Sequence, residues 1–167
     1  MKIGWIALGC PKNQVDTDYM IGFAEEAGFT MTARPEEADI LVINTCSFIE
    51  TATQESVDTI LEFAAYKKDR CRLLVVVGCL PQRYGRKLEK LLPEVDLWLG
   101  TGEYSRLPDL IKRALTEKKR DKFFAQAPAG WLPPALAERP LTTKSFFAYV
   151  KIAEGCDHRC LYCIIPQ

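Results

Sequence analysis

The sequence is poor in histidine and has no excess of either charge. His158 is the one histidine among 167 residues, and 22 basic side chains balance 22 acidic ones. A chain without net positive charge has no bulk attraction for nucleic acid, so direct nucleic-acid binding is not indicated in this portion. No apolar stretch approaches the roughly 18 residues that a membrane helix requires. These absences favour a cytoplasmic protein without a membrane partner.

Apolar runs alternate with segments of helical period along the first two thirds of the chain. The run at 73–77 is apolar at every position, as expected for a strand that helices cover on both sides. We therefore predict an α/β fold with a doubly wound parallel sheet. The predicted strands are 2–8, 40–43, 73–77 and 97–99, and the predicted helices are 16–27, 53–66, 82–92 and 106–116.

Three regions of the chain differ in composition. Residues 1–124 form the predicted α/β domain. The proline-rich stretch 125–145 breaks both helical and strand periodicity, so we predict a linker there. The apolar stretch 146–152 predicts the opening strand of a second domain, of which 146–167 would be the truncated start.

Three cysteines crowd the last dozen residues. Cys156, Cys160 and Cys163 form a C-x3-C-x2-C pattern. Thiolates so close together repel one another unless a cation neutralises them, so the spacing predicts a metal site. Three thiolate ligands suit a cubane iron–sulfur cluster that keeps one iron open for a substrate. Zinc is the alternative, but the sequence has no second paired-cysteine unit, and His158 stands too close to Cys156 for an easy chelate.

A second set of cysteines follows three of the predicted strands. Cys10, Cys46 and Cys79 each stand where a strand is expected to pass into a helix. The carboxyl ends of parallel strands form the ligand crevice of an open α/β sheet, so these residues should converge into a second metal site. The helix N-termini that follow should lower the pKa of the thiols. Three buried thiols without a ligand role are the alternative.

Residues next to this second set are candidates for shaping the site. Gly9 and Gly78 fit tight turns in which backbone passes close to an inorganic group, and ordinary turn glycines are the equal alternative. Cys71 precedes its strand and so belongs at the opposite edge of the sheet, and we assign it no role. Five polar residues could donate hydrogen bonds to sulfides or serve as caps and turn residues, namely Lys12, Asn13, Asn44, Thr45 and Gln82.

The two cysteine sets resemble a known enzyme family. C-x3-C-x2-C with Tyr162 before the last cysteine is similar to the pattern of the radical S-adenosylmethionine (SAM) superfamily, and the order of both sets resembles its methylthiotransferase family. The stretches at 9–13, 44–49 and 54–56 look most like the RimO branch, which modifies an aspartate of a small-subunit ribosomal protein. The MiaB branch, which modifies a tRNA adenosine, usually shows a Gln-Met-Asn run that this sequence lacks.

The resemblance implies cofactors, partners and an activity. It implies two 4Fe–4S clusters, one on each cysteine set, and SAM bound at the terminal set with Tyr162 as a binding residue. The implied reaction adds a methylthio group to the β-carbon of the aspartate, with flavodoxin or ferredoxin as electron donor. The tRNA-modifying enzyme and a non-catalytic iron–sulfur module are alternatives. Since 146–167 would hold one strand and the cluster loop of a radical SAM barrel, we expect this portion alone to be inactive.

Overall fold

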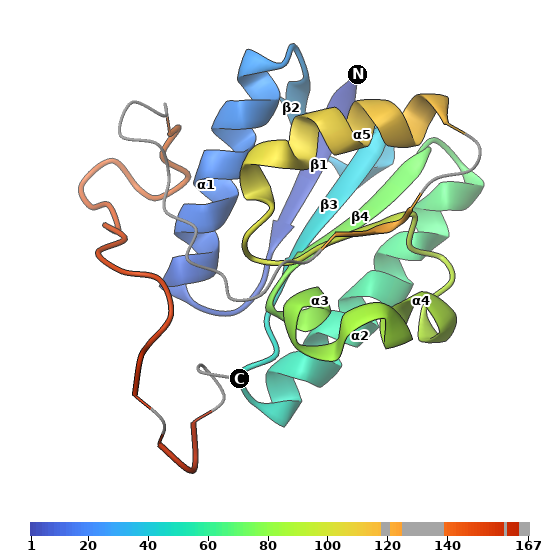
Figure 1. The fold of residues 1–167 in the computed structure, drawn as a ribbon. Coiled ribbons are helices and arrows are strands. Elements are labelled where there is room, and N and C mark those ends of the chain that lie inside the picture. The colour runs from blue at the N-terminus through green and yellow to red at the C-terminus, as the bar shows by residue number, and fades with distance from the viewer. Residues whose placement is uncertain (118–120, 125–138, 159, 164–167) are drawn as a thin grey trace.

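A six-stranded sheet forms the core of the protein. The computed structural model describes residues 1–117, 121–124, 139–158 and 160–163. Neighbouring strands are parallel and lie in the order β2-β1-β3-β4-β5-β6 (Figure 1). The strand order reverses once, because β2 lies on one side of β1 and β3 lies on the other. The strands are β1 (Lys2–Ala7), β2 (Thr30–Thr32), β3 (Ile40–Thr45), β4 (Leu73–Gly78), β5 (Leu97–Leu99) and β6 (Phe123–Phe124).

Helices cover both faces of this sheet, which confirms the doubly wound parallel architecture (Figure 1). α1 (Pro11–Glu26) and α5 (Leu107–Thr116) pack on one face, and α2 (Glu50–Ala64), α3 (Cys79–Tyr84) and α4 (Leu88–Leu91) pack on the other. A hydrophobic core lies on each face of the sheet, and successive residues of β3 and β4 pack alternately into one core and the other. Both strands are buried at every position. Cover on both faces explains why these strands are continuously apolar at their centres.

The helix boundaries differ most from those predicted at the start of α1 and around Gly85. α1 begins at Pro11, five residues before the predicted start, because proline suits the first helical turn and Cys10 before it is extended. The single helix predicted at 82–92 is wrong. α3 ends at Tyr84, where Gly85 adopts a φ of 64°, and a 3-10 turn (Gly85–Lys87) then leads into α4.

Three errors concern strands. β2 and β6 were not predicted, because strands of three and two residues carry little periodic signal. The strand predicted at 146–152 is wrong, since this stretch is irregular and runs beside α1 (Figure 1). Within the described part of the chain no strand pairs with it, and a strand needs a neighbour to satisfy its backbone. Of the predicted linker, residues 125–138 lie outside the described residues.

No helix in the described ranges is long and apolar enough to cross a membrane.

Candidate metal centre

The cysteines of the first set lie at the carboxyl edge of the sheet. β1, β3 and β4 are neighbours, and Thr45 stands opposite Gly78 in the β3–β4 register. Cys46 and Cys79 are therefore the first residues after two adjacent strands, and Cys10 follows the end of β1 directly before α1. Doubly wound sheets open their ligand crevice where the strand order reverses, which is here between β1 and β3. The structure thus brings all three cysteines to that edge, and their role as ligands stays a prediction.

Gly9 allows the loop before Cys10 to lie directly against Cys46. Its φ is 90°, and a Cβ at this position would lie 2.6 Å from the Cβ and 3.0 Å from the Sγ of Cys46. Both the dihedral and the contact exclude a side chain. The sequence predicted a close approach to an inorganic group, whereas the close approach in the structure is to the neighbouring cysteine itself.

Hydrogen bonds fix the backbone around Cys46. The Nδ2 of buried Asn13 donates to the carbonyl oxygens of Leu8 (2.9 Å) and Thr45 (3.0 Å), which ties the β1 loop to the end of β3. Ser56 on α2 donates through Oγ to the Cys46 carbonyl (2.8 Å) and accepts from the Cys46 N–H (3.2 Å). The position of Cys46 is therefore set by the sheet and by two helices.

Three of the polar residues considered as sulfide donors form hydrogen bonds with the backbone. Asn44 donates through Nδ2 to the Asn13 carbonyl (2.9 Å), and Thr45 donates through Oγ1 to a carbonyl of β4 (2.6 Å). Gln82 accepts through Oε1 from the Thr101 N–H (3.0 Å). Turn and loop fixation, the alternative role, is therefore the one that the structure shows for Asn44 and Thr45.

The thiols of the first set interact electrostatically. Burial raises the pKa of the Cys79 thiol to about 11, with Lys12 lowering it and the charges of Cys46 and Cys10 adding to the rise. The net shift of the Cys79 pKa is therefore upward rather than downward as predicted, because burial is its largest cause. A metal that binds here has to displace protons from the thiols.

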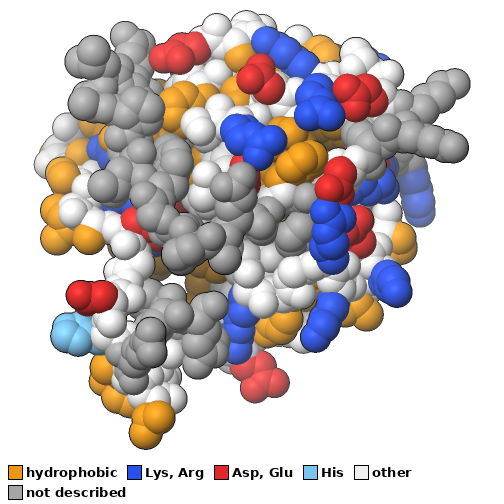
Figure 2. Space-filling model, viewed as in Figure 1, with side chains coloured by type: hydrophobic (Ala, Val, Ile, Leu, Met, Phe, Trp, Pro, Cys, Tyr) orange, Lys and Arg blue, Asp and Glu red, His pale blue; other side chains and the backbone are white. Residues whose placement is uncertain are grey.

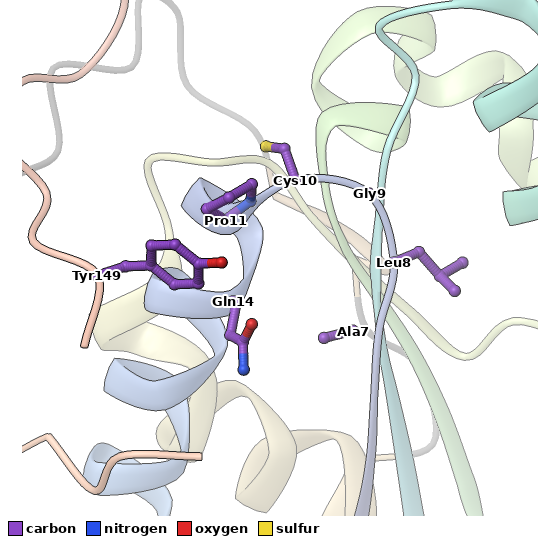
Figure 3. Close-up of a pocket in the computed structure, with 7 residues that line it drawn as sticks. All are labelled: Ala7, Leu8, Gly9, Cys10, Pro11, Gln14 and Tyr149. Atoms are coloured by element: carbon purple, nitrogen blue, oxygen red, sulfur yellow. The ribbon is translucent and has the colours of Figure 1, made fainter. Parts of the chain in front are cut away.

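A pocket of about 300 Å³ opens beside Cys10. Figure 3 shows its wall formed by the end of β1, the first turn of α1 and the ring of Tyr149, which faces Pro11 and Gln14. In the described ranges, no three His, Cys, Asp or Glu side chains lie close enough together to hold a metal ion. The donor set, three thiols at one edge beside an open pocket, fits an iron–sulfur cluster in its chemistry, although the ligand geometry is not preformed.

The terminal set lies on an irregular loop. Cys156 and Cys160 are exposed, Cys163 is half-buried, and the Cys163 N–H donates to the Cys160 carbonyl (3.0 Å). Tyr162 is 92% exposed, so its proposed place beside SAM stays a prediction. Hydrophobic side chains of this terminal part are exposed as well, at the lower left of Figure 2.

Cys71 behaves as predicted. It precedes β4 at the opposite edge of the sheet, its side chain is buried, and its thiol donates to the Leu73 carbonyl (3.3 Å). Burial raises the pKa of this thiol. Cys71 therefore lies apart from the first set, and its lack of a ligand role stays a prediction.

Three charged residues close to the cysteines were not predicted to take part in the site. The side chains of Asp16, Lys151 and Glu154 are 0%, 3% and 7% exposed, and they form ion pairs with one another and with Lys12. Buried charges are costly unless they are paired, so such a group needs a structural reason. In the sequence, Lys151 and Glu154 stand three residues apart shortly before Cys156, but this spacing does not mark either residue as buried.

Fold and site together define a class of protein: a doubly wound α/β domain with three cysteines at its strand ends, followed by a C-x3-C-x2-C loop. Residues 2–100 match the family described as Uncharacterized protein family UPF0004. The chain belongs to that family.

Curated relatives carry a more specific name. The chain is 48% identical over 99% of its length to a protein of Caldicellulosiruptor saccharolyticus named Ribosomal protein uS12 methylthiotransferase RimO, and 44% identical over its whole length to the protein of that name from Clostridium tetani. The protein of that name from Pelotomaculum thermopropionicum is 46% identical over 99% of the chain. The chain spans 38%, 37% and 37% of these relatives. The resemblance to RimO-type methylthiotransferases is confirmed.

Proposed function

We propose that the chain is the N-terminal part of a radical SAM methylthiotransferase that modifies the β-carbon of an aspartate in ribosomal protein uS12. The main support is the convergence of Cys10, Cys46 and Cys79 at one sheet edge, in a chain 48% identical to a relative named for that activity. The proposed domains are the α/β domain at 1–124, a linker at 125–145 and the start of a radical SAM domain at 146–167. The enzyme would act in the cytoplasm, where ribosomes are modified.

When bound, one 4Fe–4S cluster on each cysteine set supplies the radical and sulfur chemistry that protein side chains lack. The chain's own residues prepare the first set. Gly9 keeps the loop free of a side chain, and Asn13 and Ser56 hold the backbone of Cys46. Lys12 places a positive charge near Cys79, which favours the thiolate that a metal needs.

The substrate assignment has two supports. The relatives are named for ribosomal protein uS12. The chain has no net charge, and on the face drawn in Figure 2 basic and acidic side chains are interspersed, so that face offers no broad basic surface for tRNA. An electron donor such as flavodoxin or ferredoxin completes the proposal, because reductive cleavage of SAM consumes an electron.

The test uses the full-length protein, reconstituted anaerobically with iron and sulfide and incubated with SAM, a reductant and uS12. We expect mass spectrometry to show a methylthio group in place of one hydrogen on a uS12 aspartate. The variants Cys46→Ala and Cys160→Ala should abolish the product, and the matched control Cys71→Ala should retain it. Modification of tRNA adenosine with unmodified uS12 would favour the MiaB-like activity, and SAM cleavage by none of these proteins would favour a non-catalytic module.

A further inference from the structure

Four charged side chains form a closed ring between α1 and the terminal segment. Asp16 contacts both lysines, with Oδ2 2.8 Å from the Lys12 Nζ and Oδ1 2.8 Å from the Lys151 Nζ. Glu154 also contacts both, with Oε1 3.1 Å from the Lys12 Nζ and Oε2 paired with Lys151. Each charge therefore has two opposite neighbours, and the ring is neutral as a whole.

The ring is buried, which makes its geometry demanding. Asp16, Lys151 and Glu154 are less than one tenth exposed, and Lys12 is 30% exposed. Buried ion pairs add little net stability compared with apolar residues, but loss of one partner leaves an uncompensated charge. Such a ring favours one placement of the terminal segment along α1, because that placement pairs all four charges.

The ring contains residues that stand close to both cysteine sets in the sequence. Lys12 stands two residues after Cys10, and Glu154 stands two residues before Cys156. Lys12 also interacts electrostatically with Cys79. Along the chain, the ring therefore lies within two residues of a cysteine of each set.

Further contacts continue the same docking along α1. The Thr142 Oγ1 donates to the Asp18 carboxylate (2.5 Å), and the Arg139 guanidinium lies 5.5 Å from the ring centre of Tyr19. Tyr149 closes the pocket beside the first turn of the helix (Figure 3). The segment therefore passes from the end of α1 towards its start and delivers the terminal loop to the edge that carries the first set.

We infer that Lys12, Asp16, Lys151 and Glu154 are positioning residues that fix the chain leading to the terminal cysteines against α1, and so set the two cysteine sets relative to each other. The docking itself does not depend on the activity. Its consequence for catalysis rests on the proposed function.

The docking is tested by hydrogen exchange on the 167-residue chain. In Lys151→Gln we expect the amides of 139–158 to exchange roughly tenfold faster or more, because a buried carboxylate loses its partner. The matched control is Lys144→Gln, an exposed lysine of the same segment, which should leave exchange unchanged. The amides of β3 and β4 report whether the domain stays folded, and Glu154→Gln provides a second, isosteric variant. Equal exchange in all three variants and the wild type would overturn the inference.

A double-mutant cycle tests the ring as a unit. Asp16→Asn and Lys151→Gln should each accelerate exchange of 139–158, and the double variant should be no faster than the more affected single variant, because the members act together. Multiplicative effects would contradict a common ring.

The catalytic consequence is tested separately in the full-length protein. Lys151→Gln should lower kcat on uS12 roughly tenfold or more while iron content and the KM for SAM stay at wild-type values, and Lys144→Gln should change none of them. An unchanged kcat in Lys151→Gln would overturn the positioning role. If the wild-type enzyme modifies no uS12, the proposed function fails, and the exchange experiment still decides whether the ring docks the segment.

Discussion

The two cysteine sets differ in how the fold holds them. In the first set, Cys46 is 6% exposed and its backbone is bound by Ser56 and flanked by the contact of Asn13. In the terminal set, Cys156 and Cys160 are exposed on an irregular loop. The first set takes its position from the sheet and from the helices that pack on it, whereas the second stands on a short irregular loop. Packing between distant segments thus brings one cysteine set to a common edge, and short sequence spacing brings the other together.

Among the tests of this difference between the two cysteine sets, we expect the largest effect from substitution of Gly78, directly before Cys79. Gly78 has a φ of 99°, and an added Cβ would lie 2.3 Å from the Asn44 Oδ1 and 2.7 Å from the Thr45 carbonyl oxygen. We expect Gly78→Ala to lower the free energy of unfolding by about 3 kcal/mol, measured by urea denaturation.

Gly155, beside the terminal set, is the matched control. It also has a positive φ, 73°, but nothing lies within 4 Å of its added Cβ. Gly155→Ala should change the free energy of unfolding by less than about 0.5 kcal/mol, because the exposed loop can adjust. Equal losses in the two variants would show that the sets are held alike.

The next largest expected difference between the two sets is the rate at which their thiols are alkylated. In the metal-free protein, Cys79 is half-buried with a pKa raised to about 11, so at about pH 8 its thiolate fraction is roughly a hundredfold below that of a thiol with the ordinary value. Its alkylation by iodoacetamide should be correspondingly slow and should rise about tenfold per pH unit until near its pKa. Exposed Cys156 and Cys160 should react first, and buried Cys71 should react slowly.

Mass spectrometry of the individual peptides measures these rates, with unfolded protein as the control in which all seven thiols react alike. Faster alkylation of Cys79 than of Cys160 in the folded protein would contradict the difference between the sets.

The sequence was informative where a signal is local or repeated. The apolar runs predicted the four inner strands, and because the ends of parallel strands share an edge, the location of Cys10, Cys46 and Cys79 followed. The apolar stretch 146–152 predicted a strand, but it is irregular in the structure and Phe146, Val150 and Ile152 are exposed there. The break at Gly85 was missed, since one glycine within a helical period gives a weak signal.

The ionic ring could not be predicted. Lys151 meets Asp16 across 135 positions of sequence, and nothing local marks either residue as buried. The roles of Asn13 and Asn44 were also open, because an amide beside a cysteine can serve a sulfide or a carbonyl equally well. Their contacts follow from the packing of α1 against the ends of β1 and β3.

Asn13→Ala gives the smallest of these effects. It removes the donor from the carbonyl oxygens of Leu8 and Thr45, and we expect a loss of about 2 kcal/mol in the free energy of unfolding, because one buried and one partly buried acceptor lose a partner. The control Gln54→Ala removes an exposed bond to Asp58 on α2 and should cost less than about 0.5 kcal/mol. Similar urea midpoints for the two variants would show that Asn13 does not hold the first set.

The most direct test of two separate cluster sites is iron content, combined with the EPR spectrum of the reduced protein after anaerobic reconstitution with iron and sulfide. Three variants are compared with the wild type: Cys→Ala at 10, 46 and 79 together, Cys→Ala at 156, 160 and 163 together, and Cys71→Ala. The account predicts that each triple variant loses about four irons and one EPR signal, whereas Cys71→Ala loses neither. Zinc in place of iron, or a loss confined to one set, would contradict it.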